Sequence, residues 1–130
     1  MKLKGKTALI TGGGSGLGFA FAKRLAQDGA NIVIADIRGA SDAAKILQES
    51  DFKAVGVALD VSQEESVIAA VDVVNSSYGG VDILVNNAAL FSTLVNKPFD
   101  EIDSAEWMKV MTVNTLGPFL CAKHFSPHMK

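Results

Sequence analysis

The stretch TGGGSGLG, Thr11 to Gly18, carries five glycines in eight residues. The strand-like apolar run 7–11 leads into it, and a helix-like run follows it. Backbone N–H groups left free at the start of a helix, together with the positive end of the helix dipole, form a binding site for phosphate. A strand-to-helix turn alone would need only one or two glycines. The stretch therefore favours a phosphate-binding loop, with a ligand-free turn as the structural alternative.

The spacing of the glycines narrows the kind of loop. Gly12, Gly16 and Gly18 follow G-x-x-x-G-x-G, whereas G-x-G-x-x-G would need a glycine where Leu17 stands. No Lys-Ser or Lys-Thr pair follows, so the lysine of a P-loop is missing and hydrolysis of a nucleoside triphosphate is disfavoured. A methyltransferase on a similar sheet would want an acidic residue before the first glycine, where Thr11 stands.

Short apolar runs of strand length recur along the chain: TALIT (7–11), NIVIAD (31–36), AVGVALDV (54–61) and VDILVNN (81–87). They are apolar on both faces, which is typical of strands covered on both sides. Helical patterns alternate with them, and this order indicates right-handed βαβ crossovers. The sequence predicts an α/β fold, a Rossmann-like doubly wound parallel sheet of about four strands with helices on both faces.

Apolar spacing predicts which faces of the helices pack. One stripe holds Leu17, Ala20, Phe21 and Leu25, and another holds Val67, Val71, Val74 and Tyr78. Ser62 with Glu65 forms a capping box before the second of these helices, and a weaker helix is expected over about 41–50. A last helix should begin at Asp103 or Ser104, with Glu106 completing a capping box, and run toward His124. Trp107, Met111 and Cys121 are expected to pack in the core or in an interface.

A long connection, LFSTLVNKPFDEID (90–103), follows the fourth run. Long connections at the carboxyl ends of strands are often functional, so we expect this one to line a substrate entrance. Its Leu90, Phe91, Leu94 and Val95 suit an apolar substrate. We expect residues 1–130 to form a portion of a single-domain protein, ending before a fifth strand and leaving the fourth as a hydrophobic edge.

The composition limits the class of protein. The 130 residues are 48% hydrophobic, which suits one packed domain, and the net charge of −2 comes without a basic block, so no nucleic-acid partner is expected. The single cysteine permits no internal disulfide, and no run approaches the ~18 apolar residues of a membrane span. We therefore expect a soluble, cytoplasmic protein with no membrane partner. No metal site is expected, because Pro127 interrupts the spacing of His124 and His128 and no third ligand joins them.

Asp36 ends the second run about twenty residues after the glycines, where a carboxylate can accept hydrogen bonds from the ribose of an adenosine whose pyrophosphate lies on the loop. A 2′-phosphate would bring like charge close to this carboxylate. NAD is therefore predicted rather than NADP, although Arg38 follows two residues later. The alternative is that Asp36 is a solvent-exposed aspartate in a turn, without a ligand.

Taken together, these residues resemble the short-chain dehydrogenase/reductase family over the whole chain. TGGGSGLG is similar to that family's T-G-x-x-x-G-x-G, Asp36 to its NAD-selecting acid, Asp60-Val61 to its adenine contact, NNAA (86–89) to its N-N-A-G, and Asn114 to its catalytic asparagine. The cofactor-binding residues implied are Gly12, Ser15, Gly16, Leu17, Gly18, Asp36, Ile37, Asp60, Val61, Asn86, Asn87 and Ala88. For the asparagine pair alone, a turn held by side-chain to backbone bonds is an equal alternative.

Asn114 allows an argument that does not need the family. Pro118 lies four residues further along the last helix and has no N–H to give to the carbonyl of Asn114. That carbonyl is left for a water, and Gly117 would ease a kink. The family assigns this asparagine to anchoring a water in a proton relay; a helix that merely bends around the sheet is the alternative.

The resemblance implies a catalytic serine, tyrosine and lysine that this stretch of sequence lacks. The only tyrosine is Tyr78, and Asp82 stands where the lysine would be. We therefore expect an NAD-dependent oxidoreductase acting on an alcohol or ketone as the complete protein, with this chain alone inactive. The alternative is a non-catalytic dinucleotide-binding module or an inactive fragment. The family also implies a homo-oligomer, a dimer or tetramer.

Overall fold

The computed structural model describes residues 1–91 and 93–129. Within them, one parallel sheet has the strand order β3-β2-β1-β4. The strands are β1 (Thr7–Thr11), β2 (Asn31–Asp36), β3 (Ala54–Ala58) and β4 (Ile83–Val85). The first two match the predicted runs, and the last two are shorter than the predicted 54–61 and 81–87. The polar residues that end those runs therefore lie in loops beyond the carboxyl ends of the strands.

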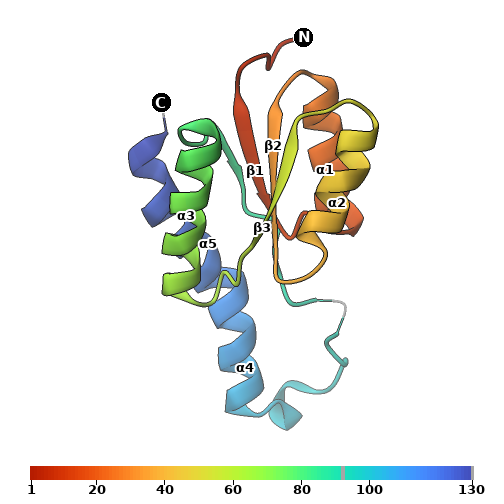
Figure 1. Ribbon diagram of the computed structural model, residues 1–130. Coiled ribbons are helices and arrows are strands. Elements are labelled where there is room, and N and C mark those ends of the chain that lie inside the picture. Colours follow the sequence, from red (N-terminus) through yellow and green to blue (C-terminus); the bar gives the residue numbers. More distant parts are fainter. Residues whose placement is uncertain (92, 130) are drawn as a thin grey trace.

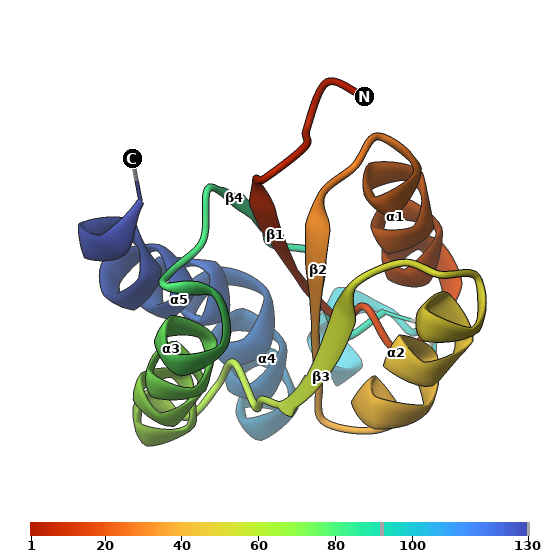
Figure 2. The same cartoon turned by 45° about the horizontal axis from the view of Figure 1, so that its top comes forward.

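Helices cover both faces of the sheet, which confirms the doubly wound fold. They are α1 (Gly16–Gln27), α2 (Ala40–Glu49), α3 (Glu64–Tyr78), α4 (Ser104–Met111) and α5 (Gly117–Phe125), with a π-helix η2 (Thr112–Leu116) between the last two and short 3-10 turns η1 (Phe99–Glu101) and η3 (Ser126–His128). Figures 1 and 2 show α1 and α2 on one face and α3 and α5 on the other, and in Figure 1 α4 projects below the sheet. No helix within the described ranges has the length and apolar character to cross a bilayer.

The two faces of the central strands build two separate cores, because successive side chains of a strand point to opposite faces. Leu9 of β1 and Val33 of β2 pack with α3 and α5, around Val67, Val74 and Phe125. Ile10 and Ile34 pack on the other face with α1 and α2, around Ala22, Ala26 and Leu47. The predicted stripe Val67, Val71, Val74 is buried as expected, and Tyr78 packs against its edge.

The predicted inner face of α1 is wrong for three of its four residues. Leu17 and Phe21 are 66% and 39% exposed and Ala20 is exposed too, whereas Leu25 is partly buried against the core. The buried residues of α1 are Gly18, Ala22 and Ala26. Small residues face the sheet because the start of α1 lies close against the end of β1. A Cβ on Gly18 would lie 2.3 Å from the Gly12 carbonyl oxygen. The larger apolar residues gave the stronger periodic signal and pointed to the wrong face.

The predicted capping box of Ser62 with Glu65 is also wrong. Helix α3 takes Gln63 as its N-cap and has no side-chain cap. Ser62 instead donates from its N–H and its hydroxyl to Asp60 Oδ1, at 3.0 and 2.6 Å. A local side-chain turn competes successfully with capping here, as serine and aspartate allow.

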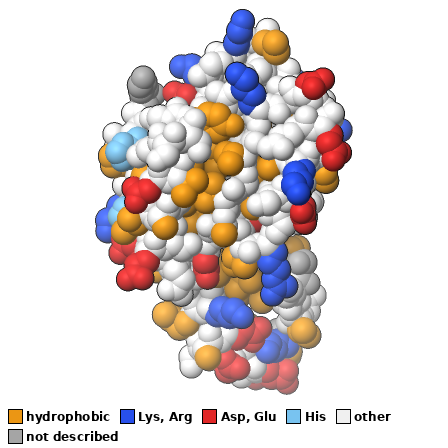
Figure 3. All heavy atoms as spheres, in the orientation of Figure 1, with side chains coloured by type: hydrophobic (Ala, Val, Ile, Leu, Met, Phe, Trp, Pro, Cys, Tyr) orange, Lys and Arg blue, Asp and Glu red, His pale blue; other side chains and the backbone are white. Residues whose placement is uncertain are grey.

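The start of the last helix is confirmed, and half of its capping box forms. Asp103 is the N-cap of α4 and accepts from the Glu106 N–H at 2.7 Å. The Glu106 carboxylate pairs with Lys97 at 2.6 Å rather than returning to Asp103. Cys121 is fully buried, but Trp107 and Met111 are 52% and 37% exposed, so these two do not belong to the core of this chain. Figure 3 shows hydrophobic and charged side chains together on the projection below the sheet.

Candidate dinucleotide-binding site

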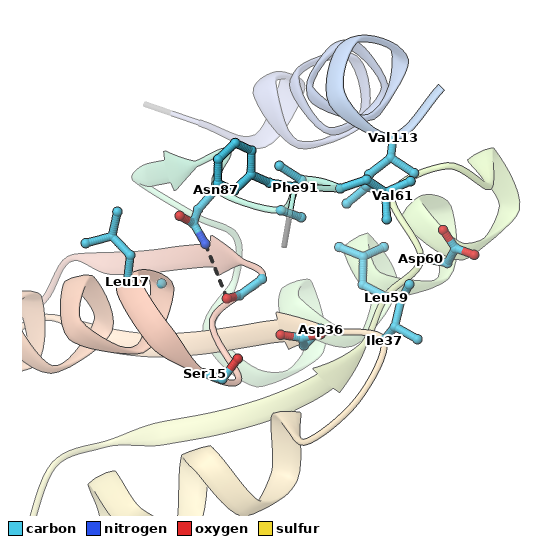
Figure 4. Close-up of a pocket in the computed structure, with 15 residues that line it drawn as sticks. Ser15, Leu17, Asp36, Ile37, Leu59, Asp60, Val61, Asn87, Phe91 and Val113 are labelled. Carbon is cyan, nitrogen blue, oxygen red and sulfur yellow. Dashed lines mark hydrogen bonds between the residues drawn. The ribbon is translucent and has the colours of Figure 1, made fainter. Parts of the chain in front are cut away.

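A cavity of about 580 Å³ opens at the carboxyl ends of the strands, between the loops that follow β1 and β4. In the strand order β3-β2-β1-β4, β2 and β3 lie on one side of β1 and β4 lies on its other side. Open α/β sheets bind ligands at such a switch point. The cavity is lined by Gly12, Ser15, Leu17, Gly18, Asp36, Ile37, Leu59, Asp60, Val61, Asn87, Ala88, Ala89, Leu90, Phe91 and Val113. Figure 4 shows these side chains converging from the sheet, from the glycine loop Thr11 to Gly18 and from the last helical segment, which comprises α4, η2 and α5.

The hydroxyl of Thr11 joins the ends of β1 and β4. It donates to the Val85 carbonyl at 3.4 Å and accepts from the N–H groups of Asn87 and Ala88, each at 3.0 Å. Thr11 itself is 1% exposed, so water does not compete for these bonds. The first residue of the quoted motif is thus a structural tie that brings the asparagine segment beside the glycine loop, Thr11 to Gly18.

Contacts within the protein require glycine at Gly12 and at Gly18 of that loop. Gly12 has φ +66°, and a Cβ there would lie 3.0 Å from the Ala88 Cα. A Cβ on Gly18 would lie 2.3 Å from the Gly12 carbonyl oxygen and 2.5 Å from Asn87 Nδ2. Asn87 Nδ2 donates to that same carbonyl at 3.2 Å, the bond drawn in Figure 4. The glycines therefore serve the close packing of α1, β1 and the asparagine segment, and that packing leaves the start of α1 facing the cavity.

Asp36 ends β2 at the edge of the cavity, where the sequence predicts it. Its Oδ2 accepts from the Gly14 N–H at 2.9 Å, and its Oδ1 accepts from the Arg38 N–H at 3.2 Å. The carboxylate is oriented by the backbone on either side of it. A second cavity of about 1000 Å³ adjoins the first and shares Asp36 and Asp60 with it, while Arg38 and Lys109 also line it.

Asp60 and Val61 follow β3 and lie on the same cavity wall. Ser62 holds the Asp60 carboxylate through Oδ1, and the Asp60 N–H donates to Ser66 Oγ at 2.9 Å. Val61 is 5% exposed, and a Cβ on Gly117 would lie 2.7 Å from its Cγ2. The absence of a side chain at Gly117 thus lets the start of α5 pack directly on this wall.

Asn114 does not line the cavity but fixes a residue that does. Its Oδ1 accepts from the Leu90 N–H at 2.7 Å, and its Nδ2 donates to the Leu90 carbonyl at 3.1 Å. Both amide groups are engaged, so the side chain sets where the connection 90–103 leaves the site. Asn114 lies in the π-helix η2, four residues before Pro118, which is where the sequence predicts a helix irregularity. A π-turn is a common feature of functional sites in helices.

Most of the predicted cofactor residues are brought together in this cavity, and a few are not. Gly16 and Asn86 do not line it, and Asn86 is exposed. Sequence reasoning missed Leu59 and Val113, which are apolar neighbours of the predicted Asp60 and Asn114 and carried no motif of their own. Of the connection 90–103, Leu90 and Phe91 reach the cavity, Leu94 and Val95 line a separate pocket with Trp107, and Ser92 lies outside the described residues.

The charged groups of the cavity are acidic. Asp36 and Asp60 line it, and no lysine or arginine does so among the residues that the structure describes. A phosphate in this cavity would therefore depend on backbone N–H groups. Ser15, the N-cap of α1, makes no side-chain cap bond, and the first turn of α1 carries no acidic residue. Both features suit an anion at this helix start.

Elsewhere in the described residues, the titratable groups with a shifted pKa do not form a second candidate site. Burial raises the pKa of the Cys121 thiol to about 11 and also raises the pKa of Tyr78. A buried thiol with a raised pKa is a poor nucleophile. His124 contacts Glu64 at 2.7 Å, and His128 lies in the turn η3. Over residues 1–91 and 93–129, no three His, Cys, Asp or Glu side chains gather in a way that would hold a metal ion.

Comparison with known proteins agrees with this geometry. The family model described as short chain dehydrogenase matches residues 6–130. The chain belongs to the short chain dehydrogenase family. It is 38% identical over 125 residues to a cis-4-hydroxycyclohexanecarboxylate dehydrogenase of Sinomonas cyclohexanicum, covering 95% of this chain and 49% of that protein. It is 37% identical over 130 residues to glucose 1-dehydrogenase 2 of Bacillus subtilis, covering 98% and 50%.

Solved structures of short chain dehydrogenases share the fold. A short chain dehydrogenase/reductase from Burkholderia phymatum, solved in complex with NAD, superposes with a TM-score of 0.91 at 32% identity, covering 99% of this chain and 46% of that one. The chain thus spans about half the length of the relatives it matches. The resemblance read from the sequence is confirmed, and so is the Rossmann-like fold.

Proposed function

We propose that this chain is the dinucleotide-binding portion, residues 1–130, of a single-domain NAD-dependent oxidoreductase. The complete protein would transfer a hydride between nicotinamide and an alcohol or ketone. The observation that carries the proposal is the Asp36 carboxylate, held by two backbone N–H groups at the edge of the cavity beside the glycine loop. The dehydrogenase names of the relatives and the NAD complex of the structural neighbour support the reaction class and the cofactor.

The residues present fit a dinucleotide. The glycine loop and the start of α1 would hold the pyrophosphate, with Ser15 able to donate its hydroxyl to a phosphate oxygen. Asp36 would accept from the adenosine ribose, and Asp60 with Val61 would take the adenine. Asn87 and Ala88, tied to Thr11, would border the next ribose. Bound nicotinamide supplies a carbon that accepts or releases hydride, and the protein supplies binding and orientation.

Asn114 is proposed as the member of the catalytic set that this chain contributes. Its side chain is committed to Leu90, so a role in proton transfer falls to its backbone carbonyl, which Pro118 cannot use. A water on that carbonyl could pass a proton between solvent and the site. The serine, tyrosine and lysine implied by the family resemblance are not among these residues.

The assembly and location are also proposals. Apolar side chains on the last helical segment are exposed: Trp107, Met108, Met111, Leu116 and Phe119. These support a homodimer or homotetramer in the complete protein, as the family resemblance implies. The lone, buried Cys121 supports a reducing compartment, and we propose the cytoplasm. The substrate is proposed to be a small-molecule alcohol or ketone.

The cofactor assignment is tested with Asp36→Ala in the protein expressed from its complete coding sequence. The substitution removes a charged acceptor for the ribose hydroxyls, which is worth roughly tenfold or more in affinity. We expect NAD to lose at least that factor and NADP far less, measured as Kd by nucleotide fluorescence titration. Equal losses for both nucleotides would contradict the assignment.

A Y-x-x-x-K motif in the coding sequence beyond Lys130 would support the enzyme over a non-catalytic module, and an in-frame stop would support the module.

A further inference from the structure

The contact between Gly14 and Asp36 is built from backbone on one side and carboxylate on the other. The Gly14 N–H donates to Asp36 Oδ2 at 2.9 Å, while the Arg38 N–H donates to Oδ1 at 3.2 Å. None of the ion pairs found in the described part of the chain involves Asp36. The carboxylate is therefore fixed in direction by two neutral backbone donors at the edge of the cavity.

The space beside this carboxylate exists because residue 14 has no side chain. A Cβ on Gly14 would lie 2.8 Å from Asp36 Oδ2 and 2.7 Å from the Arg38 carbonyl oxygen. The backbone of Gly14 lies outside the left-handed region, unlike Gly12 and Gly16, so alanine could adopt its conformation. Gly14 is glycine for the room it leaves to Asp36, not for the turn.

We propose that Gly14 is a positioning residue for nucleotide selection, acting through the Asp36 carboxylate; this inference rests on the proposed function. With alanine at 14, the carboxylate and the backbone at Arg38 must move away from the glycine loop. NAD then loses an oriented acceptor for its ribose hydroxyls. NADP loses less, because the same displacement moves a negative charge away from its 2′-phosphate. Gly14 thereby sets the discrimination between the two nucleotides without needing to touch either.

The test compares Gly14→Ala with Gly13→Ala in the protein expressed from its complete coding sequence. A Cβ on Gly13 would crowd the Ile10 carbonyl oxygen at 3.0 Å and Ile34 Cγ2 at 3.2 Å, and no atom of Asp36 would lie closer to it than these. We expect Gly14→Ala to lower the ratio of the NADP Kd to the NAD Kd by about tenfold, the worth of one oriented hydrogen bond to a charged group. Gly13→Ala should raise the Kd of both nucleotides by the same factor and leave the ratio of the two Kd values unchanged.

A double-variant cycle and a second substitution complete the experiment. In an Asp36→Ala background, Gly14→Ala should leave the ratio unchanged, because there is no carboxylate left to position. If Gly14→Ala does not fold, as judged by thermal melting, Asp36→Glu serves instead. Its extra methylene carries the carboxylate away from the Gly14 N–H, and the ratio should fall in the same way.

The outcomes separate this inference from the function on which it rests. A ratio unchanged in Gly14→Ala, or in Asp36→Glu where that variant is used, overturns the role of Gly14. A fall in the ratio that persists in the Asp36→Ala background also overturns it, since the effect would not pass through the carboxylate. Failure of the unsubstituted protein to bind NAD or NADP would instead overturn the proposed function.

Discussion

The glycine loop and the last helical segment border the same cavity but are held in place by different means. The last helical segment, named here the interrupted helix, comprises α4, η2 and α5, residues 104–125. Between Thr11 and Gly18 the contacts are made largely by backbone: Gly12 carbonyl to Asn87, Gly14 N–H to Asp36, Gly18 against Gly12. At Gly12, Gly14 and Gly18 of this loop, the space around the backbone requires glycine.

The interrupted helix is held mainly by side chains reaching across long stretches of sequence. Asn114 binds the backbone of Leu90, and Lys123 and His124 both reach Glu64 on α3. No residue of α4 or of the π-helix is buried, and packing into the core begins only with α5. One wall of the site is thus set by close backbone contact, and the other by a small number of polar anchors together with the apolar face of α5. Substitutions in the glycine loop should therefore destabilise the protein by overpacking, and those in the interrupted helix by loss of polar contacts.

The largest effect is expected for Gly18→Ala. Its Cβ would lie 2.3 Å from the Gly12 carbonyl oxygen, a backbone atom that cannot swing away like a side chain. Overpacking of this kind costs roughly 1–3 kcal/mol or more, and the shift of α1 should abolish measurable NAD binding. Denaturant unfolding and nucleotide titration measure the two effects.

Gly16→Ala is the matched control for Gly18→Ala. Its backbone has φ +55° but its Cβ would meet nothing within 4 Å, so it should cost only the backbone strain, about 1–2 kcal/mol. If Gly18→Ala lowers stability and NAD binding no more than Gly16→Ala, close contact does not hold the loop in place. The proposed difference between the loop and the interrupted helix would then be wrong.

Sequence patterns predicted the glycine wall well because its determinants are local. Asp36 lies at the end of β2 and Gly12 directly after β1, as the strand and loop patterns require. The buried face of α1 was not predictable in the same way. The large apolar residues Leu17 and Phe21 dominate the periodicity, while the close approach of α1 to the sheet selects Gly18 and Ala22 for the inside.

The interrupted helix was predictable in outline only. Pro118 indicated an irregularity near Asn114, and the structure has a π-helix there. The bond from Asn114 to Leu90 joins residues 24 positions apart, and no local pattern encodes such a partner. The same holds for Ser62, whose hydroxyl had two competing partners within reach, a helix start and the Asp60 carboxylate. Which of the two polar contacts forms depends on the tertiary structure around Ser62.

A smaller effect than that of Gly18→Ala is expected for Asn114→Ala. It removes both bonds to Leu90, and each is worth about 1 kcal/mol, so the free energy of unfolding should fall by about 2 kcal/mol. The amide of Leu90 should exchange faster with solvent. Thr115→Ala is the control on the same turn, because its hydroxyl makes only an exposed contact to Met111 Sδ at 3.9 Å. Equal stability of the two variants would show that Asn114 is not an anchor.

Pro118→Ala should change stability by about 1 kcal/mol or less, the worth of one hydrogen bond. It restores an N–H that can bond the Asn114 carbonyl and so favours a regular helix over the π-turn. In the complete protein we expect a lower kcat with little change in the Kd for NAD, measured by steady-state kinetics and titration. An unaltered kcat would remove the carbonyl of Asn114 from the proposed proton path.

The smallest effect concerns the anchor between α3 and α5. The hydrogen bonds from His124 and from Lys123 hold the pKa of Glu64 below its ordinary value of 4.5. Because the folded pKa is lowered, the carboxylate stabilises the fold above about pH 4.5, and this contribution is lost as the pH falls through the lower, folded pKa. The side chain is 43% exposed, so the effect is modest.

Glu64→Gln should therefore flatten the acid limb of the stability curve, measured as Tm against pH, without changing the site at the glycine loop. Glu65→Gln removes the same charge from the same first turn of α3 but leaves the contacts to Lys123 and His124 in place. If both variants flatten the curve equally, the effect belongs to the helix dipole rather than to the anchor. The position of the interrupted helix would then depend on Asn114, on the ion pair of Glu106 with Lys97 and on the apolar face of α5.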